Sequence, residues 1–265
     1  MRRALVIAAV VVVLPIAVLA VEVQLARTGD RLEDEDGSRP RQEVVRRGED
    51  PLHVIWLGDS TTTGVGAEDF EESMAWRVAE RITDGPVLLT VLGRSGDQIH
   101  EVLDHQLAAL PDDLTEDVRG QVVFVSIGAN DVTALTRRPT FEDRYRELVA
   151  RVSEVLDESD IPSRVVLVGI PDLGTAPRLL QPLREVAGFR AAQLDDVIEE
   201  VARDRGLHHV ELADTTGPVF ASDPDRYFAG DDYHPTGDGH GVWADAIVRS
   251  LDFAGIAIGE LGRRG

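Results

Sequence analysis

The residue with the clearest chemical potential is Ser60. It follows the apolar run 52–57 and the pair Gly58-Asp59, and small hydroxyl residues and glycines come after it. We interpret this stretch as a buried strand that delivers a serine to the end of a sheet, where the sites of open α/β proteins form. A serine hydroxyl becomes a useful nucleophile only when a neighbouring base removes its proton. A nucleophilic Ser60 therefore requires a base and an acid that orients this base.

The candidate base is His234, in the segment Asp231-Asp232-Tyr233-His234 before the last predicted helix. The pKa of an unperturbed histidine, near 6.5, suits a general base. A carboxylate three residues away can hold the imidazole and stabilise its charged form, so spacing favours Asp231 over Asp232 as the acid. The other histidines fall within predicted strands or helices, and we expect structural, packing or solvated roles for them: His53, His100, His105, His208, His209 and His240.

Two further loops follow apolar runs and carry groups that suit an oxyanion. Gly96 lies in the loop after the second run, and Asn130 lies in the loop after the third. Glycine lets the backbone approach a substrate closely, and the asparagine amide is a neutral donor that does not compete as a base. Asp59 and Asp131 are expected to fix their loops through hydrogen bonds to backbone amides.

The pattern around these loops alternates between predicted strands and helices. Five near-continuous apolar runs are predicted strands: 52–57, 86–92, 121–127, 164–170 and 207–212. Five segments with helical periodicity are predicted helices: 71–83, 97–110, 141–156, 189–205 and 239–251. This alternation predicts a parallel sheet with helices on both faces. The carboxyl ends of parallel strands share one edge, so the loops described above can converge there.

Taken together, these motifs resemble the SGNH hydrolases, also called GDSL-type esterases and lipases, over residues 52–251. The resemblance implies a flavodoxin-like α/β/α sandwich of three layers with a parallel sheet of about five strands. It also implies that Ser60 is the nucleophile, His234 the base and Asp231 the orienting acid. The implied oxyanion hole consists of the backbone N–H groups of Ser60 and Gly96 and the side-chain amide of Asn130. No metal or organic cofactor is implied.

The implied activity is cleavage of a carboxylic ester through an acyl-enzyme on Ser60, with a small-molecule, lipid or polysaccharide ester as substrate. Two alternatives stay open at the level of sequence. One is an acyl transferase that uses the same site on a carbohydrate, and the other is a non-catalytic carbohydrate-binding module, which would not need Ser60, Asp231 and His234 together.

Composition excludes several other classes. The net charge of -21 and the pI near 4.6 argue against a nucleic-acid partner, which would require a basic face. The sequence contains no lysine, which excludes Schiff-base catalysis and a P-loop. It contains no cysteine, which excludes disulfides and thiolate catalysis.

The N-terminal region predicts a membrane or secretory segment. After Met1-Arg2-Arg3, residues 4–21 carry no charge, and such a run is about as long as a bilayer is thick. Residues 1–25 are therefore a signal anchor, with the catalytic domain outside the cell membrane, or a cleaved signal peptide of a secreted protein. We further expect a disordered linker over 26–50, the hydrolase domain over 51–253 and a tail over 254–265.

Overall fold

A six-stranded sheet forms the middle of the molecule in the computed structural model, which describes residues 32, 41–115 and 117–262. The order across the sheet is β1-β3-β2-β4-β5-β6. The strands are β1 (Arg41–Arg46), β2 (Leu52–Gly58), β3 (Val87–Val91), β4 (Gly120–Ser126), β5 (Ser163–Val168) and β6 (His208–Val210). Neighbouring strands are parallel, except that β1 runs antiparallel to β3.

The chain leaves β2 for β3 on one side of the sheet and then crosses to β4 on the other. Without β1, this order is the flavodoxin-like arrangement, so the predicted α/β/α class is confirmed. The point where the order reverses lies between β2 and β4. A ligand site in such a sheet is expected just beyond the carboxyl ends of these two strands.

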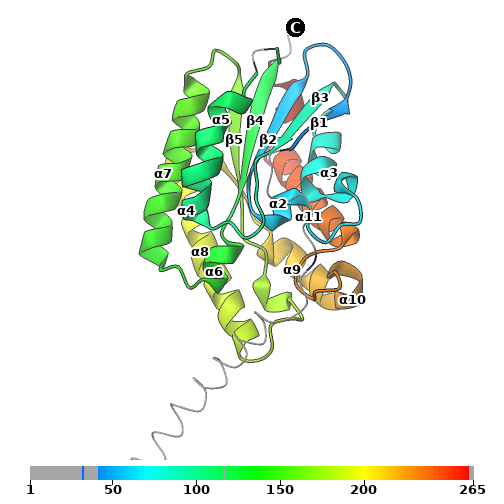
Figure 1. The fold of residues 1–265 in the computed structure, drawn as a ribbon, viewed down its shortest axis with the longest axis vertical. Helices are drawn as coiled ribbons and strands as arrows, with labels where there is room; N and C mark the ends of the chain where they lie inside the picture. Colours follow the sequence, from blue (N-terminus) through cyan, green and yellow to red (C-terminus); the bar gives the residue numbers. More distant parts are fainter. Residues whose placement is uncertain (1–31, 33–40, 116, 263–265) are drawn as a thin grey trace, which may run out of the picture.

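Helices cover both faces of the sheet (Figure 1). One group contains α4 (Ile99–Glu101), the π-helical segment η2 (Val102–Gln106), α5 (Leu107–Asp113), α7 (Arg138–Asp157) and α8 (Leu183–Arg205). The other contains α3 (Met74–Arg81), α9 (Ala213–Ser222), α10 (Pro224–Tyr227) and α11 (Gly237–Phe253). Shorter turns are α2 (Ser60–Thr63), η1 (Phe70–Glu72), α6 (Ala129–Thr133), η3 (Leu173–Thr175) and η4 (Ile258–Glu260).

The central strands are buried over their whole length because helices pack against both sides. Every residue of β2 and of β4 is buried, which explains why their sequences read as continuous apolar runs. Trp56 of β2 stacks on Phe124 of β4, with ring centroids 4.5 Å apart. This aromatic pair fixes the two strands beside each other immediately before the loops that carry Ser60 and Asn130.

Within the predicted disordered linker over 26–50, strand β1 corrects the prediction for residues 41–46. Residues Arg41–Arg46 pair with β3 and add an antiparallel edge strand to the five predicted parallel ones. Their charged composition hid this strand, because an edge strand is held by backbone hydrogen bonds and keeps polar side chains in water. Val44 is 53% exposed, and only its neighbour Val45 packs against the core.

Two C-terminal segments also differ from the sequence-based prediction. No helix is predicted between 212 and 239, but α9 and α10 lie there, because Gly217 and Pro218 inside α9 interrupt its helical pattern in the sequence. The predicted tail 254–265 packs against the domain as far as it is described, since Ile258 of η4 is buried. Both segments therefore belong to the domain.

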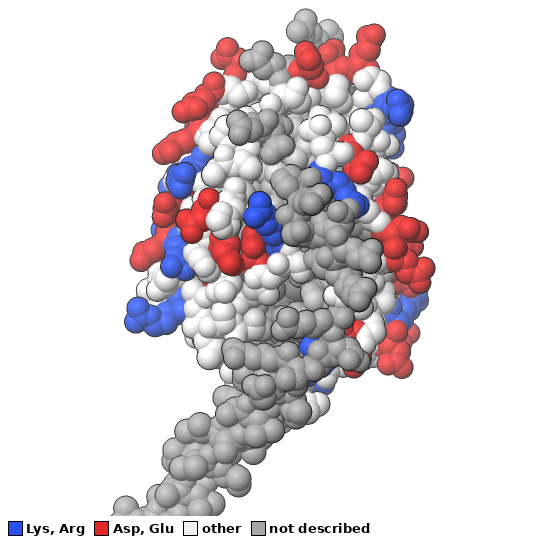
Figure 2. All heavy atoms as spheres, in the orientation of Figure 1, with Lys and Arg blue, Asp and Glu red and all other residues white. Residues whose placement is uncertain are grey.

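The predicted membrane segment, residues 1–25, lies outside the described residues. Among the helices of the described part, none has both the length and the apolar character needed to span a bilayer. Figure 2 shows acidic side chains along both edges of the face in view, with basic side chains set among them. This distribution agrees with the strongly negative net charge.

The stacking of Trp56 on Phe124 predicts that two substitutions by alanine differ strongly in their effect on the free energy of unfolding. Trp56→Ala removes a fully buried ring and should lower the free energy of unfolding by about 3–5 kcal/mol. The control Val44→Ala changes an exposed side chain of β1 and should cost less than about 0.5 kcal/mol. Urea denaturation measures both, and equal losses would contradict the assignment of Trp56 to the core.

Candidate active site

Ser60, His234 and Asp231 form a continuous hydrogen-bonded chain at the carboxyl edge of the sheet. The Asp231 Oδ2 atom lies 2.7 Å from His234 Nδ1, and His234 Nε2 lies 3.1 Å from Ser60 Oγ. With the Nδ1 proton donated to the carboxylate, Nε2 is free to accept the proton of the Ser60 hydroxyl. This is the geometry that proton abstraction from a serine requires.

The loop between α10 and α11 holds the histidine and its carboxylate together. Asp231 Oδ1 accepts hydrogen bonds from the backbone N–H groups of Tyr233 and His234, at 3.1 and 2.9 Å. Burial pulls the pKa of Asp231 upward, but the hydrogen bonds from His234 and Tyr233 outweigh it and leave this pKa below its ordinary value. Arg178 adds a cation 3.8 Å from Asp231 Oδ2 and donates to the Asp231 carbonyl.

Ser60 begins α2, and Asp59 caps this short helix. The Asp59 Oδ1 atom accepts hydrogen bonds from the backbone N–H and the hydroxyl of Thr61, as expected for a residue that fixes the loop. Burial raises the pKa of Asp59 to about 6. Glycine is required at position 58, because a Cβ atom there would collide with the carbonyl oxygen of Ser126.

Three hydrogen-bond donors border the hollow beside Ser60. Within the described part of the chain, the backbone N–H groups of Ser60 and Gly96 have no hydrogen-bond acceptor. Gly96 adopts a φ of +87°, a conformation that favours glycine, and a Cβ atom there would meet no other atom within 4 Å. The Asn130 amide donates one hydrogen to Asp97 O at 3.0 Å and retains a second. Ser60, Gly96, Asn130 and His234 line one groove.

Gln106 is a positioning residue that the sequence did not single out. Its buried side chain accepts a hydrogen bond from Gly58 N and donates to Gly58 O, at 2.9 and 2.7 Å. The same amide also donates to Asp97 Oδ2 at 2.8 Å. Gln106 ends the π-helical segment η2, a local widening of the helix that often occurs near functional sites. It connects the strand before Ser60 to the loop that carries Gly96.

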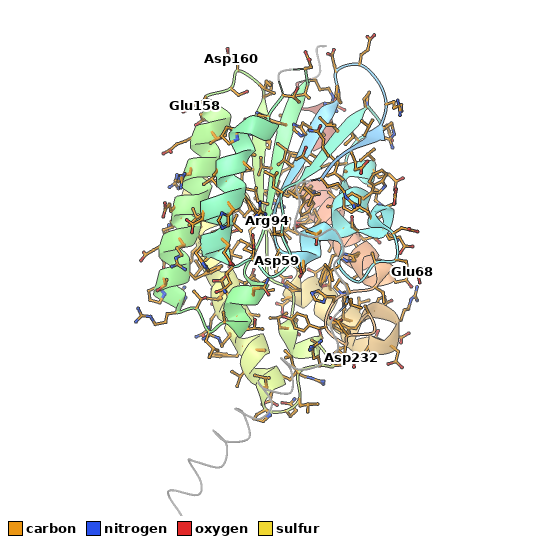
Figure 3. The ribbon with its side chains drawn as sticks, in the orientation of Figure 1. Asp59, Glu68, Arg94, Glu158, Asp160 and Asp232 are labelled. Carbon is orange, nitrogen blue, oxygen red and sulfur yellow. The ribbon has the colours of Figure 1, made fainter. Side chains whose placement is uncertain are left out.

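The other carboxylates of the loops lie outside the hydrogen-bonded chain. Asp131 Oδ2 accepts from the backbone N–H of Ile99, so Asp131 fixes its loop, as predicted. Asp232 is exposed, and its carbonyl accepts from Arg178 N. Figure 3 shows Asp59 near the end of the sheet and Asp232 farther out, while Glu158 and Asp160 lie at the opposite end of the molecule.

The remaining histidines with described contacts have structural surroundings. His240 accepts a hydrogen bond from Met74 N and donates one to Val65 O, and burial lowers its pKa to about 4. Burial likewise lowers the pKa of His53 to about 4. His208 contacts Ser250, and His209 contacts Asp195, both away from Ser60. These positions agree with structural or packing roles.

Comparison with known proteins adds a family and a relative. A sequence model of the GDSL-like lipase/acylhydrolase family matches residues 56–242. A GDSL-like esterase of Mycobacterium tuberculosis is 28% identical over 222 residues, which cover 81% of this chain. The match spans 66% of the length of that relative.

Solved structures share the fold at low sequence identity. A lipolytic protein of the G-D-S-L family from Veillonella parvula has a TM-score of 0.59 at 14% identity, over 75% of this chain and 97% of that chain. A lipase/acylhydrolase from Enterococcus faecalis has a TM-score of 0.54 at 21% identity, over 81% of this chain and 100% of that chain.

The raised pKa of Asp59 predicts that Asp59→Asn increases the free energy of unfolding by an amount that depends on pH. Between pH 3.8 and about 6 the folded protein keeps a proton that the unfolded chain releases, so stability falls as the pH rises through this window. At pH 7.5 the ionised carboxylate costs on the order of 3 kcal/mol, and asparagine removes this cost while keeping an acceptor for Thr61. The increase in the free energy of unfolding should therefore be about 2 kcal/mol larger at pH 7.5 than at pH 4.

Chemical denaturation at the two pH values measures this difference. The exposed Asp232→Asn is the matched control and should change the free energy of unfolding little at either pH. If Asp59→Asn increases the free energy of unfolding equally at pH 4 and pH 7.5, folding does not shift the pKa of Asp59.

Proposed function

Because this chain belongs to the GDSL-like lipase/acylhydrolase family, a family of ester-bond hydrolases, we propose that it is a serine esterase. The observation that carries the proposal is the chain of hydrogen bonds from Asp231 through His234 to Ser60. A binding module would not need a serine, a base and an acid in contact. Substrates of this site are carboxylic esters of small molecules, lipids or polysaccharides.

The first half of the reaction forms an acyl-enzyme. His234 Nε2 takes the hydroxyl proton as Ser60 Oγ forms a bond to the ester carbonyl carbon. The tetrahedral intermediate then expels the alkoxy group, which leaves as the alcohol with the proton that His234 returns. Asp231 keeps the imidazole in the correct orientation and stabilises its positive charge while it holds the proton.

The negative charge on the carbonyl oxygen is stabilised by three donors. These are the Ser60 N–H, the Gly96 N–H and the hydrogen of the Asn130 amide that Asp97 does not accept. Each such donor is typically worth about 2.7–4 kcal/mol in the transition state, because it is fixed before the charge develops. The contacts of Gln106 and Asn130 with Asp97 support this role by holding the loop of Gly96 in place.

The second half of the reaction releases the acid. Water enters the place that the alcohol has left, His234 takes one of its protons, and the hydroxide attacks the acyl carbon. Collapse of this intermediate breaks the bond to Ser60 Oγ, which regains its proton from His234. The cycle consumes one ester and one water and yields one acid and one alcohol.

The nucleophile is tested by Ser60→Ala in a p-nitrophenyl acetate assay. Removal of the hydroxyl should lower kcat by about a millionfold, to the background of the assay. Ser222→Ala, which changes an exposed serine of α9, is the control and should keep the activity of the unmodified protein. Undiminished hydrolysis by Ser60→Ala would show that another group attacks the ester.

The orienting acid is tested by comparing two neighbouring carboxylates. Asp231→Asn should lower kcat by about 10⁴-fold, because the amide favours the wrong histidine tautomer. Asp232→Asn alters an exposed side chain with no bond to His234 and should leave kcat within about twofold. Steady-state kinetics on both variants decide the assignment, and the reverse order of losses would identify Asp232 as the acid.

A further inference from the structure

Two hollows of very different size meet at Ser60. One is a cavity of about 30 Å³, and the other is a groove of about 520 Å³. Ser60, Asn130, Tyr233 and His234 line both, so a substrate held at the hydroxyl can reach into each of them. Because the cavity is much smaller than the groove, the half of a bound ester that enters the cavity must be short, whereas the half in the groove can be large.

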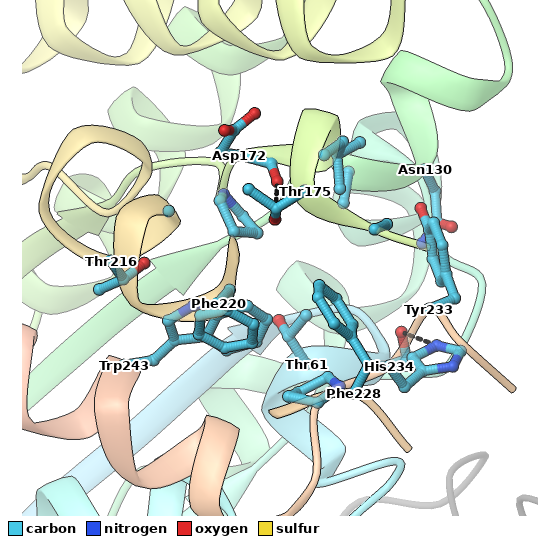
Figure 4. Close-up of a pocket in the computed structure, with 17 residues that line it drawn as sticks. Thr61, Asn130, Asp172, Thr175, Thr216, Phe220, Phe228, Tyr233, His234 and Trp243 are labelled. Carbon is cyan, nitrogen blue, oxygen red and sulfur yellow. Dashed lines mark hydrogen bonds between the residues drawn. The ribbon is translucent and has the colours of Figure 1, made fainter. Parts of the chain in front are cut away.

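Aromatic rings close the far side of the small cavity (Figure 4). Phe220 stacks on Trp243 at a centroid distance of 5.3 Å and meets Phe228 edge to face at 5.2 Å. All three rings are buried, and they come from α9, the segment after α10, and α11. A wall built from three interlocked rings cannot retreat without disturbing the packing between these elements.

The volume of the cavity sets a limit on what it can hold. One water-sized group needs about 10–15 Å³ of such space, so about 30 Å³ accommodates two or three groups. The carbonyl carbon of a bound ester sits at Ser60 Oγ and its oxygen at the donors, outside this count. The cavity therefore has room for two or three carbons beyond the carbonyl. A longer chain would have to displace Phe220 or Phe228, and such overpacking is unfavourable.

The sequence of the reaction steps indicates which half of the ester occupies the cavity and which half occupies the groove. The acyl group stays bonded to Ser60 through both steps, so the smaller and less open cavity suits it. The alcohol must depart before water attacks, and both must pass through an open space. The groove fits this need, since exposed Leu135 and Val186 line it together with polar Gln98.

We propose that the enzyme is a short-chain acyl esterase, which takes acyl groups of two to four carbons in the small cavity and a bulky alcohol in the groove. This inference rests on the proposed esterase function. It adds a ceiling on acyl length that the arrangement of Ser60, His234 and Asp231 does not itself impose. The aromatic wall of Phe220, Phe228 and Trp243 sets the ceiling.

The acyl ceiling is tested with p-nitrophenyl esters of two, four, eight and twelve carbons, all with the same alcohol. We expect kcat/KM to be highest for the two- and four-carbon esters and at least tenfold lower at eight carbons. Equal or faster hydrolysis of the eight- or twelve-carbon ester overturns the inference but leaves the esterase function standing. Hydrolysis of no ester, or equal hydrolysis by Ser60→Ala, overturns the function itself.

Substitutions in the aromatic wall test whether the small cavity sets the ceiling on acyl length. Phe220→Ala and, independently, Phe228→Ala should raise the ratio of eight-carbon to two-carbon kcat/KM at least tenfold. The control Phe189→Ala removes a ring of α8 that is 65% exposed, and it should leave the ratio within twofold. Two folded wall variants with an unchanged ratio would overturn the assignment of the cavity to the acyl group.

A second substrate pair tests the groove, and it does so in the unmodified protein, without any risk of misfolding. 1-Naphthyl acetate joins a short acyl group to a larger alcohol than p-nitrophenol, and we expect its kcat/KM to lie within about tenfold of that of p-nitrophenyl acetate. A loss of a hundredfold or more on this ester would show that the alcohol does not occupy the large groove.

Discussion

The hydrogen bonds of Gln106 to both polar groups of the Gly58 residue are the constraint on which the site depends. They close the end of β2 where its pairing with β3 has stopped at Trp56 and Val91. The same amide extends to Asp97, beside Gly96, and Asn130 holds Asp97 from the other side. The serine, the glycine amide and the asparagine amide are thereby set in one rigid frame, although they follow three different strands.

The sequence predicted the five parallel strands and the convergence of their ends because doubly covered strands read as unbroken apolar runs. It could not predict β1, whose stability comes from backbone pairing rather than from apolar side chains. It could not identify Gln106 either, since a glutamine on a predicted helix gives no sign that a π-helical turn points it at Gly58. The cavity wall was equally hidden, because Phe220, Phe228 and Trp243 meet only after α9, α10 and α11 have packed.

Burial and hydrogen bonds give the buried ionisable groups of the domain different charges. Burial holds His240 and His53 neutral by lowering their pKa to about 4, and it raises the pKa of Asp59 to about 6. Asp231 alone among these groups has hydrogen bonds that outweigh burial and keep it ionised. Asp231 therefore stays ionised at a lower pH than Asp59, and its negative charge contacts His234, where a transient imidazolium needs it.

The acid and the histidine lie only three residues apart, whereas the serine that they contact lies 174 residues away from the histidine. Local backbone hydrogen bonds to Asp231 shape this short loop, so aligning the pair has a small entropic cost of loop closure. Arg178 holds the loop from a distant segment through the carbonyl groups of Asp231 and Asp232. A protein designer could consequently graft the loop that carries Asp231 and His234 before the last helix of another doubly wound sheet. The host scaffold would then have to supply a hydroxyl within hydrogen-bond distance of the imidazole, a cation in the place of Arg178 and donors for the oxyanion.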